Sequence, residues 1–330
     1  MDYSQFLVMS QEIGLVAVFL LIFLFDTFAP RKALGATAPL ACVLFAAFTI
    51  VNICLPCFRP EAVEPQSAFG GMYVTNKALF MIKNILNVGV LIVLIQSIKW
   101  VNSPDQIMRR GEFFELLLVT LFGMYLMMSS RHFLTFIIGL ESASLPLAAM
   151  VAFEKKKYES HEAAIKYLLT AVFSSAILLM GISFVYALSG SLYFADIAES
   201  IVEECPLLVV ALAFVLAGVG FKLSLVPFHL WTADVYQGAP TSVTSYLSVI
   251  SKGATAIAAF IIFALAFEQF YAPIWYWMLY ALIILTITIG NLFAIRQKNM
   301  KRFLAFSSIS QAGYIMLGLI AGSPDGLTSM

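Results

Sequence analysis

The stretch from residue 220 to residue 253 reads GFKLSLVPFHLWTADVYQGAPTSVTSYLSVISKG, and it is the most informative part of the chain. Hydrophobic sequence lies on both sides of it, yet it contains two lysines, a histidine and an aspartate, namely Lys222, His229, Asp234 and Lys252. Pro227 and the glycines before it predict a helix that is interrupted within the membrane, followed by a turn and a second helix. Helix breaks at membrane depth are tolerated chiefly where they line a cavity or a binding site. The break therefore indicates a functional site.

The whole chain has the composition of an integral membrane protein. It has 330 residues, 61% hydrophobic and only 12% charged, and its mean hydropathy is +0.93. An ordinary soluble domain is about 45–50% apolar and about 25% charged. Lys and Arg balance Asp and Glu at 19 each, so the net charge does not indicate a nucleic acid partner. We predict an all-α membrane protein surrounded by the lipid bilayer.

Ten apolar runs are long enough to cross the bilayer, since a hydrocarbon core of about 30 Å requires about 20 mostly apolar residues. They lie near residues 11–29, 35–55, 76–98, 112–129, 131–152, 162–187, 206–230, 240–266, 273–295 and 302–322. The longest segments between them, 56–75 and 188–205, have room only for a short surface helix or a turn. No separate soluble domain is expected.

The distribution of basic residues supports this number of helices, because Lys and Arg gather in the loops on the inner side of a membrane. Alternate loops contain most of them: Arg31, Lys32, Lys99, Arg109, Arg110, Lys155, Lys156, Lys157, Arg296, Lys298, Lys301 and Arg302. The opposite loops contain only Arg59, Lys77 and Arg131, and the loop at 188–205 has Asp196, Glu199, Glu203 and Glu204 without a basic residue. The N-terminus is therefore predicted on the outer side.

Several charged side chains lie within the predicted helices. At about 1.5 Å rise per residue, Lys252 is about 18 Å and Glu141 about 15 Å into its helix, near the middle of the bilayer. A charge there costs at least about 2.5 to 3.5 kcal/mol and usually faces the interior of a helix bundle on an ion or proton path. Desolvation and a nearby carboxylate shift the protonation of a buried lysine in opposite directions. Glu141, Lys222 and Lys252 are therefore suited to relaying protons, the alternative being a buried structural ion pair.

Simpler interpretations apply to the other polar residues. Lys83 and Lys166 lie one or two turns from a helix end, where a lysine can extend its ammonium group to the membrane surface. His229 follows Lys222 by seven residues, which puts it near the inner boundary as an interfacial histidine. Asp234 is expected in the polar loop as a solvated or capping carboxylate.

Two short segments suggest an internal repeat. Residues 131–141 read RHFLTFIIGLE and residues 301–311 read KRFLAFSSISQ. They enter their helices from opposite sides of the membrane, as an inverted repeat requires. Glu141 then corresponds to Gln311, so the second unit lacks this carboxylate.

The repeat predicts three regions and an incomplete second unit. The counterpart of Lys222 would lie beyond Met330. The expected regions are a three-helix region at 1–111, a five-helix unit at 112–266 and the start of the second, inverted unit at 267–330.

Motifs for nucleotide or redox chemistry are missing from the sequence. It contains no P-loop, GxGxxG, CxxCH or four-cysteine cluster. The CLPC pair, Cys54 and Cys57, is interpreted as two ordinary thiols. We expect this chain to bind no metal or cofactor and to carry no electrons.

The segment FKLSLVPFHLWTADVYQGAPTSVTSYLSVISKGA closely resembles the antiporter-like membrane subunits of NADH-quinone oxidoreductase (respiratory complex I), in particular the subunit N family. GLESASLPLAAM and NMKRFLAFSSISQAGY support the resemblance, which extends over most of the chain from about residue 70. HLWTADVYQGAP favours this family over the related cation/proton antiporter subunits.

The resemblance implies a proton channel built from two inverted five-helix units, with a broken seventh helix. Glu141 on the fifth helix and Lys222 on the seventh match a pair in the family. Lys252 matches the central lysine of the eighth helix, and His229 and Lys166 match further polar positions. Lys83 matches none. Family members usually continue to about fourteen helices, so a chain ending after the tenth is a fragment or a shortened subunit.

The expected function is a proton-translocating subunit of NADH-quinone oxidoreductase in the bacterial inner membrane. The resemblance assigns NAD, FMN, iron–sulphur clusters and quinone to partner subunits, and implies sister antiporter-like subunits as neighbours. Two alternatives are a cation/proton antiporter subunit without a redox partner and a non-pumping scaffold subunit.

Overall fold

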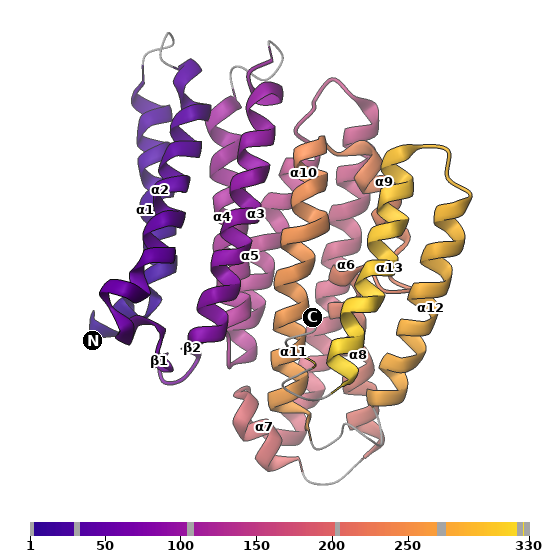
Figure 1. The fold of residues 1–330 in the computed structure, drawn as a ribbon. Helices are drawn as coiled ribbons and strands as arrows, with labels where there is room; N and C mark the ends of the chain where they lie inside the picture. Colours follow the sequence, from indigo (N-terminus) through magenta and orange to yellow (C-terminus); the bar gives the residue numbers. More distant parts are fainter. Residues whose placement is uncertain are drawn as a thin grey trace.

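A computed structural model describes residues 3–29, 34–103, 109–201, 205–268, 275–321 and 326. Arg31, Lys32, Glu203, Glu204 and Met330, which the sequence predictions use, lie outside these residues. Within them, ten helices are long and apolar enough to cross a membrane, which confirms the predicted number. Figure 1 shows them side by side, with the N-terminus at the lower end.

Six of the ten spans precede the predicted break. They are α1 (Ser10–Phe28), α2 (Thr37–Phe58), α3 (Lys77–Val101), α4 (Arg110–Ser129), α5 (Phe133–Val151) and α6 (Tyr158–Ser189). The other four are α8 (Pro206–Leu223), Thr241–Ala266, α12 (Tyr276–Ile295) and α13 (Met300–Ile320). Two short helices connect them, α7 (Phe194–Ser200) and α9 (Leu230–Gly238). Short 3₁₀ turns cover Tyr3–Met9, Leu34–Ala36 and Pro60–Val63.

The helix predicted at 206–230 is shorter than expected, because α8 ends at Leu223. Ser224 adopts the left-handed conformation, with φ of +63°. The chain is then held by a hydrogen bond from the Leu225 amide to the Gly220 carbonyl at 2.8 Å, and by another from the Val226 amide to the Thr286 hydroxyl at 2.9 Å. The break predicted from the sequence is confirmed. Thr286 of α12 accepts the hydrogen bond of the Val226 amide, which has no partner within the broken helix.

The span Thr241–Ala266 is regular helix except for one turn. α10 (Thr241–Tyr246) and α11 (Lys252–Ala266) are joined by a π-helical turn at Leu247–Ser251. Single π turns inside α-helices are rare and often mark functional sites. This one lies directly before Lys252.

A β-hairpin covers the lower end of the N-terminal helices. β1 (Gln66–Ala68) pairs antiparallel with β2 (Tyr73–Thr75), with Ala68 opposite Tyr73. The turn between them uses positive φ at Phe69, Gly70 and Gly71. Figure 1 shows the hairpin at the same end of the molecule as the N-terminus.

Two helix pairs, one in each half of the proposed repeat, pack closely together. α4 packs along α5 so closely that a Cβ on Gly139 would lie 2.6 Å from the Met127 amide nitrogen. α12 packs along α13, where a Cβ on Gly290 would lie 3.0 Å from the Ser310 amide nitrogen. Both pairs depend on small residues for their backbone approach.

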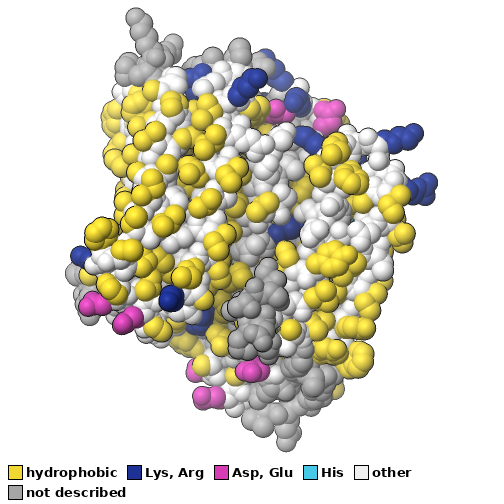
Figure 2. Space-filling view, in the orientation of Figure 1, with side chains coloured by type: hydrophobic (Ala, Val, Ile, Leu, Met, Phe, Trp, Pro, Cys, Tyr) yellow, Lys and Arg dark blue, Asp and Glu magenta, His cyan; other side chains and the backbone are white. Residues whose placement is uncertain are grey.

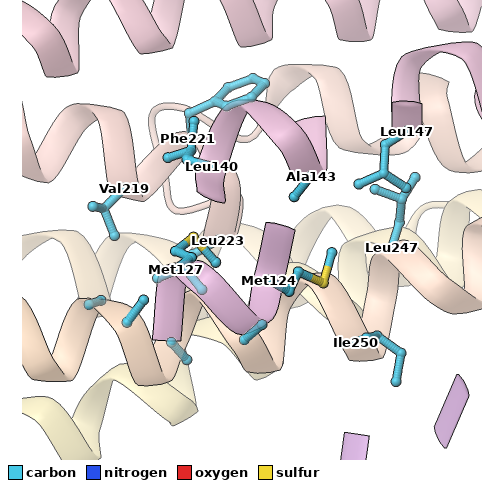
Figure 3. Close-up of a cluster of buried hydrophobic side chains, with 14 of the residues drawn as sticks. Met124, Met127, Leu140, Ala143, Leu147, Val219, Phe221, Leu223, Leu247 and Ile250 are labelled. Atoms are coloured by element: carbon cyan, nitrogen blue, oxygen red, sulfur yellow. The ribbon is translucent and has the colours of Figure 1, made fainter. Parts of the chain in front are cut away.

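The centre of the bundle is apolar. Met124 of α4, Leu140 of α5, Val219 and Leu223 of α8, and Ile250 of the π turn meet in one buried cluster (Figure 3). The face of the molecule in Figure 2 carries many hydrophobic side chains, and Lys and Arg gather toward its upper end. An apolar exterior with a basic end suits a chain that lies in a bilayer.

Candidate functional site

Lys222 is buried at the C-terminal end of α8, one residue before the helix stops. Its side chain donates a hydrogen bond to the Tyr167 hydroxyl at 3.3 Å, and its ammonium nitrogen lies 5.8 Å from the centre of the Tyr167 ring. A cation at this position also interacts favourably with the negative end of the helix dipole. Lys222 therefore has a neutral hydrogen-bond partner and lies at the C-terminal end of a helix, where the last backbone carbonyl groups have no partner within the helix itself.

Glu141 on α5 acts on Lys222 through space. Among the residues that the structure describes, no hydrogen bond or ion pair within 4 Å joins the two, and Glu141 is only partly buried. The pair predicted from the resemblance is thus present as an electrostatic neighbour and not as a direct contact. A carboxylate in this position influences the charge of the lysine without holding its proton in a hydrogen bond.

Lys252 is buried at the start of α11, with 3% of its surface exposed. Its ammonium group donates to the Ser308 hydroxyl at 2.9 Å and to the Ser308 carbonyl at 3.0 Å. The ring of Tyr236 lies 5.8 Å away from the ammonium nitrogen. Like Lys222, Lys252 faces neutral groups instead of a carboxylate.

A pocket of about 600 Å³ leads to Lys252. Four hydroxyl side chains line it along one side of α10 and the π turn, and they are Thr241, Thr244, Ser245 and Ser248. Lys301, Ser308 and Gln311 of α13 line the other side. Hydroxyl groups both donate and accept hydrogen bonds, so this row leads from the upper end of the span toward the buried amine.

His229 is buried next to the break, just before α9. Neither ring nitrogen has a well-oriented hydrogen-bond partner in the described part of the chain, although the Pro227 carbonyl lies nearby. Burial lowers the pKa of His229, and the Pro227 carbonyl opposes this only in part. The imidazole is therefore neutral at pH 7, with one nitrogen free to accept a proton.

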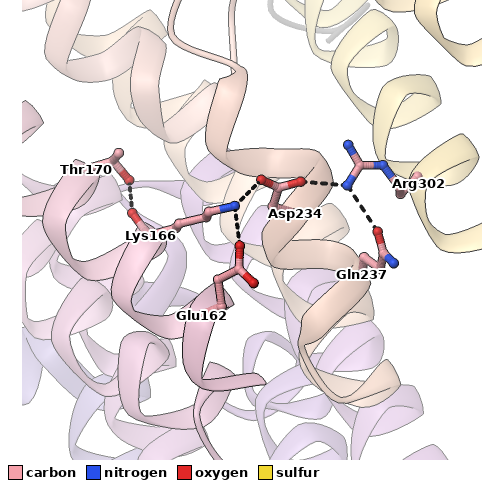
Figure 4. A network of polar contacts seen from close by, with 6 residues as sticks. All are labelled: Glu162, Lys166, Thr170, Asp234, Gln237 and Arg302. Atoms are coloured by element: carbon pink, nitrogen blue, oxygen red, sulfur yellow. Dashed lines mark hydrogen bonds and ion pairs between the residues drawn. The ribbon is translucent and has the colours of Figure 1, made fainter. Parts of the chain in front are cut away.

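Lys166 is not buried like Lys222 and Lys252 but belongs to an ion-pair network with Asp234 of α9 (Figure 4), and Figure 1 shows α9 in the upper part of the bundle. Its ammonium group contacts Asp234 at 2.5 Å and Glu162 at 2.7 Å, with 41% of its side chain exposed. Arg302 contacts the other oxygen of Asp234 at 2.6 Å and also donates to Gln237. The network connects α6, α9 and α13.

The prediction for Asp234 was wrong. It is not in a loop but in α9, and it joins two basic side chains. Burial raises its pKa, but the hydrogen bonds from Lys166 and Arg302 lower it more, so the net pKa lies below the ordinary value. The cause of the error is that α9 is only nine residues long, too short for a helical pattern to be distinguished from a polar loop.

The interpretation of Lys83 was also wrong. Its ammonium group does not reach the membrane surface, because the side chain is completely buried and paired with Glu12 at 2.6 Å. Tyr73 of the hairpin and Tyr125 of α4 flank it. The position of Lys83 near a helix end could not show that Glu12 of another helix pairs with it or that the hairpin covers it.

Sequence reasoning also did not identify the neutral partners of the lysines. Tyr167 and Tyr236 are both 1% exposed, and Ser308 lies in a helix 56 positions away from Lys252. Position 167 follows the singled-out Lys166, but nothing in the sequence distinguishes a buried tyrosine that faces a lysine from one in an apolar core.

No metal centre is found among the described residues, where no group of three His, Cys, Asp or Glu side chains converges. Cys54 and Cys57 are exposed free thiols on α2. The arrangement as a whole offers buried amines, an imidazole and hydroxyl groups, which exchange protons and do not carry electrons.

Known proteins share this sequence and this fold. A family model described as "NADH:quinone oxidoreductase/Mrp antiporter, TM" matches residues 130–330. NADH-quinone oxidoreductase subunit N of Phocaeicola vulgatus is 49% identical over 330 residues, which cover 100% of this chain and 68% of that protein. Subunit N of Azobacteroides pseudotrichonymphae is 48% identical over 329 residues, covering 100% of this chain and 67% of that protein.

A solved structure supports the same relationship. A chain of respiratory complex I from Thermus thermophilus with bound aureothin is 30% identical, with a TM-score of 0.76 over 97% of this chain and 66% of that chain. The present chain spans about two-thirds of the length of these relatives. It belongs to the NADH-quinone oxidoreductase subunit N family, the antiporter-like membrane subunits of respiratory complex I.

Proposed function

We propose that the chain translocates protons as a membrane subunit of NADH-quinone oxidoreductase. The observation that carries the proposal is the environment of Lys222 and Lys252. Both amines are buried on neighbouring spans, both contact neutral hydroxyl groups, and one lies at a helix break and the other at a π turn. Lysines that serve only to fix helices would be expected to pair directly with a carboxylate.

In the proposed path, protons pass between Lys222 and Lys252. Glu141 acts on the charge of Lys222 from a distance, so a change in its protonation changes the proton affinity of the lysine. His229, neutral and without an oriented partner, accepts and returns a proton between them. The hydroxyl-lined pocket connects Lys252 with the upper end of the bundle.

Lys166 has a different part in this proposal from the one that the resemblance implies. Its two carboxylate contacts and its exposure place it in a network at the end of the bundle. We assign it to the inner mouth of the path, where it fixes α6 against α9, while the neighbouring Tyr167 contacts Lys222.

Energy for translocation comes from other subunits. Moving one charge against about 100 mV costs about 2.3 kcal/mol, so the path needs an external driver. NAD, FMN, the iron–sulphur clusters and quinone belong to those subunits, and the translocase activity is that of the complex. We place the chain in the bacterial inner membrane beside sister antiporter-like subunits, with its N-terminus on the outer side and its basic end inside.

The test is the proton-to-electron ratio of the assembled complex in membrane vesicles. Lys222→Met and Lys252→Met are each expected to abolish the contribution of this subunit to proton translocation while NADH oxidation with an artificial electron acceptor continues. Lys155→Met, at an exposed lysine, is the matched control. An unchanged ratio and rate in both buried variants would rule out the proposal.

A second candidate is a cation/proton antiporter subunit, because the matching family model includes Mrp antiporters. Purification discriminates between the two. Co-purification with iron–sulphur subunits supports the first function, and cation-driven proton movement in their absence supports the second.

A further inference from the structure

A second group of buried charges lies outside the path of Lys222 and Lys252. Glu12 of α1 and Lys83 of α3 are 1% and 0% exposed, and their oxygen and nitrogen atoms are 2.6 Å apart. Such a pair is costly to bury, and apolar side chains of similar volume in its place are often neutral or stabilising. Helix packing alone does not account for it.

The pair is incompletely satisfied. Glu12 Oε1 accepts a hydrogen bond from Lys83, but the buried Oε2 atom has no partner among the described residues. The Asn87 side-chain nitrogen, on the next turn of α3, is also buried without one. Carboxylates in structural ion pairs normally have both oxygens hydrogen-bonded. The second oxygen of Glu12 is therefore a buried acceptor where a proton can add.

The hairpin closes the pair at the lower end of the bundle. Lys83 also donates to the Tyr73 hydroxyl at 3.1 Å, and Tyr73 is 2% exposed. Burial raises the pKa of Tyr73 to about 12, despite the opposing effect of the Lys83 charge. Tyr73 therefore keeps its own proton and separates the pair from the surface as a neutral group.

Toward the interior, the pair faces α4. The Tyr125 ring lies 5.2 Å from the Lys83 ammonium nitrogen, and the Tyr125 hydroxyl donates to the Asn87 side-chain oxygen. Thr120, which is also on α4, donates a hydrogen bond at 2.8 Å to the hydroxyl of Tyr246. Tyr246 lies six positions before Lys252 in the same span.

We propose that Glu12 and Lys83 form a second proton-exchanging site, closed toward the membrane surface by Tyr73 and connected toward the centre of the bundle by Tyr125 and Asn87. A proton on Lys83 Nζ moves along the 2.6 Å contact to Glu12, leaving a neutral amine and a neutral carboxylic acid. The N–H bond breaks, an O–H bond forms, and the net charge of the pair remains zero. Burial favours the neutral form of the pair, whereas the direct contact between the two side chains favours the charged form, so both forms are available to the site.

From the neutral pair the site can take up or release one proton without separating opposite charges in the membrane. In the part of the chain that the structure describes, the titratable groups that contact it are Tyr73 from β2 and Tyr125 from α4, in addition to the pair itself. Its participation in translocation depends on the function proposed above, whereas its protonation does not.

The decisive variant is the double replacement Glu12→Leu with Lys83→Met, in the assembled complex in native membranes. It removes both charges and keeps the volume, so the subunit is expected to assemble. If the site exchanges protons, proton translocation falls while NADH oxidation with an artificial acceptor stays normal. Thr49→Val on α2, a buried hydroxyl that donates only within its own helix, is the matched control. A normal proton-to-electron ratio in the double variant would overturn the proposal.

Lys83→Arg gives an answer even if the double variant does not assemble. An arginine retains the ion pair but does not release its proton. A purely structural pair tolerates this change, and normal translocation by an assembled Lys83→Arg complex overturns the proposal. Loss of translocation from an assembled complex supports it.

Infrared difference spectroscopy tests the protonation itself. The carbonyl stretch of a protonated carboxylic acid is expected to appear during turnover and to disappear in Glu12→Gln. If no band depends on Glu12, the site does not take up a proton. These results are independent of Lys222→Met and Lys252→Met, whose failure would remove the proposed path but not the carbonyl band.

Discussion

The buried lysines in two regions of this membrane bundle have different direct partners. In the N-terminal helices, Lys83 contacts a carboxylate at 2.6 Å and is enclosed by two tyrosine rings. In the region of the break, Lys222 and Lys252 contact only hydroxyl and carbonyl groups, and the nearest carboxylate acts on Lys222 without touching it. Lys83 thus has a titratable side chain as its direct partner, whereas the direct partners of Lys222 and Lys252 are neutral groups.

The largest effect is expected when one member of the direct pair is removed. Glu12→Leu leaves the Lys83 charge buried without its counter-ion, which costs about 3–5 kcal/mol. The thermal stability of the detergent-solubilised complex should fall strongly, and this subunit should be depleted. Lys252→Met removes a charge that has no paired carboxylate, so its complex should be close to normal in stability. Equal losses in the two variants would contradict the contrast.

The tyrosines provide a smaller and more local comparison. Tyr167→Phe removes the hydroxyl that accepts from Lys222, and Tyr73→Phe removes one that accepts from Lys83. Losing a hydrogen bond to a charged group costs about 1.5–3 kcal/mol. We expect Tyr167→Phe to have the larger effect on proton translocation, because Lys83 retains Glu12 whereas Lys222 retains no other direct partner in the described chain. Proton-to-electron ratios and melting temperatures of both variants test this.

Ser308 tests the neutral environment of Lys252. In Ser308→Ala the carbonyl of residue 308 still accepts a hydrogen bond from the amine, but the hydroxyl is lost. The expected destabilisation is about 1 kcal/mol, with a shift in the pH at which translocation is half-maximal. Ser307→Ala, whose side chain lines the same pocket, is the control. An identical pH profile in the two variants would show that the Ser308 hydroxyl does not influence Lys252.

The smallest effect is expected at the exposed network around Asp234. Its pKa is lower in the folded chain than in the unfolded chain, so its contribution is present above about pH 4 and is lost as pH falls through the lower folded value. Because these side chains are about one-third exposed, Asp234→Asn should cost no more than about 1 kcal/mol. Melting temperatures of wild type and variant should therefore differ at pH 7 and still differ at pH 4, and the difference should disappear only as pH falls below the lowered folded pKa of Asp234.

Much of the site was predictable because depth in a membrane can be calculated from position. The sequence indicates the break between Lys222 and His229, the midplane position of Lys252 and the ten spans, and the structure confirms the spans and the break. The neutral partners were not predictable. Tyr167 and Ser308 lie on other helices, and which faces of two helices meet depends on packing between residues far apart in the sequence.

Asp234 and Lys83 are two residues for which the local sequence led to a wrong prediction. Each has an ordinary local interpretation, as a loop carboxylate and as a lysine near a helix end. The difference arises from contacts with Arg302 and Glu12, which are 68 and 71 positions away. Local sequence contains no information on such contacts.

Hydrophobic length and the cost of burying a charge are properties of single segments, so the amino-acid sequence alone predicts ten segments able to cross a membrane and lysines within several of them. Which lysine pairs with a carboxylate and which faces a hydroxyl group depends on the tertiary structure. Those partners lie on different helices, and the approach of helices is set by packing of their small residues and by the hairpin that closes one end.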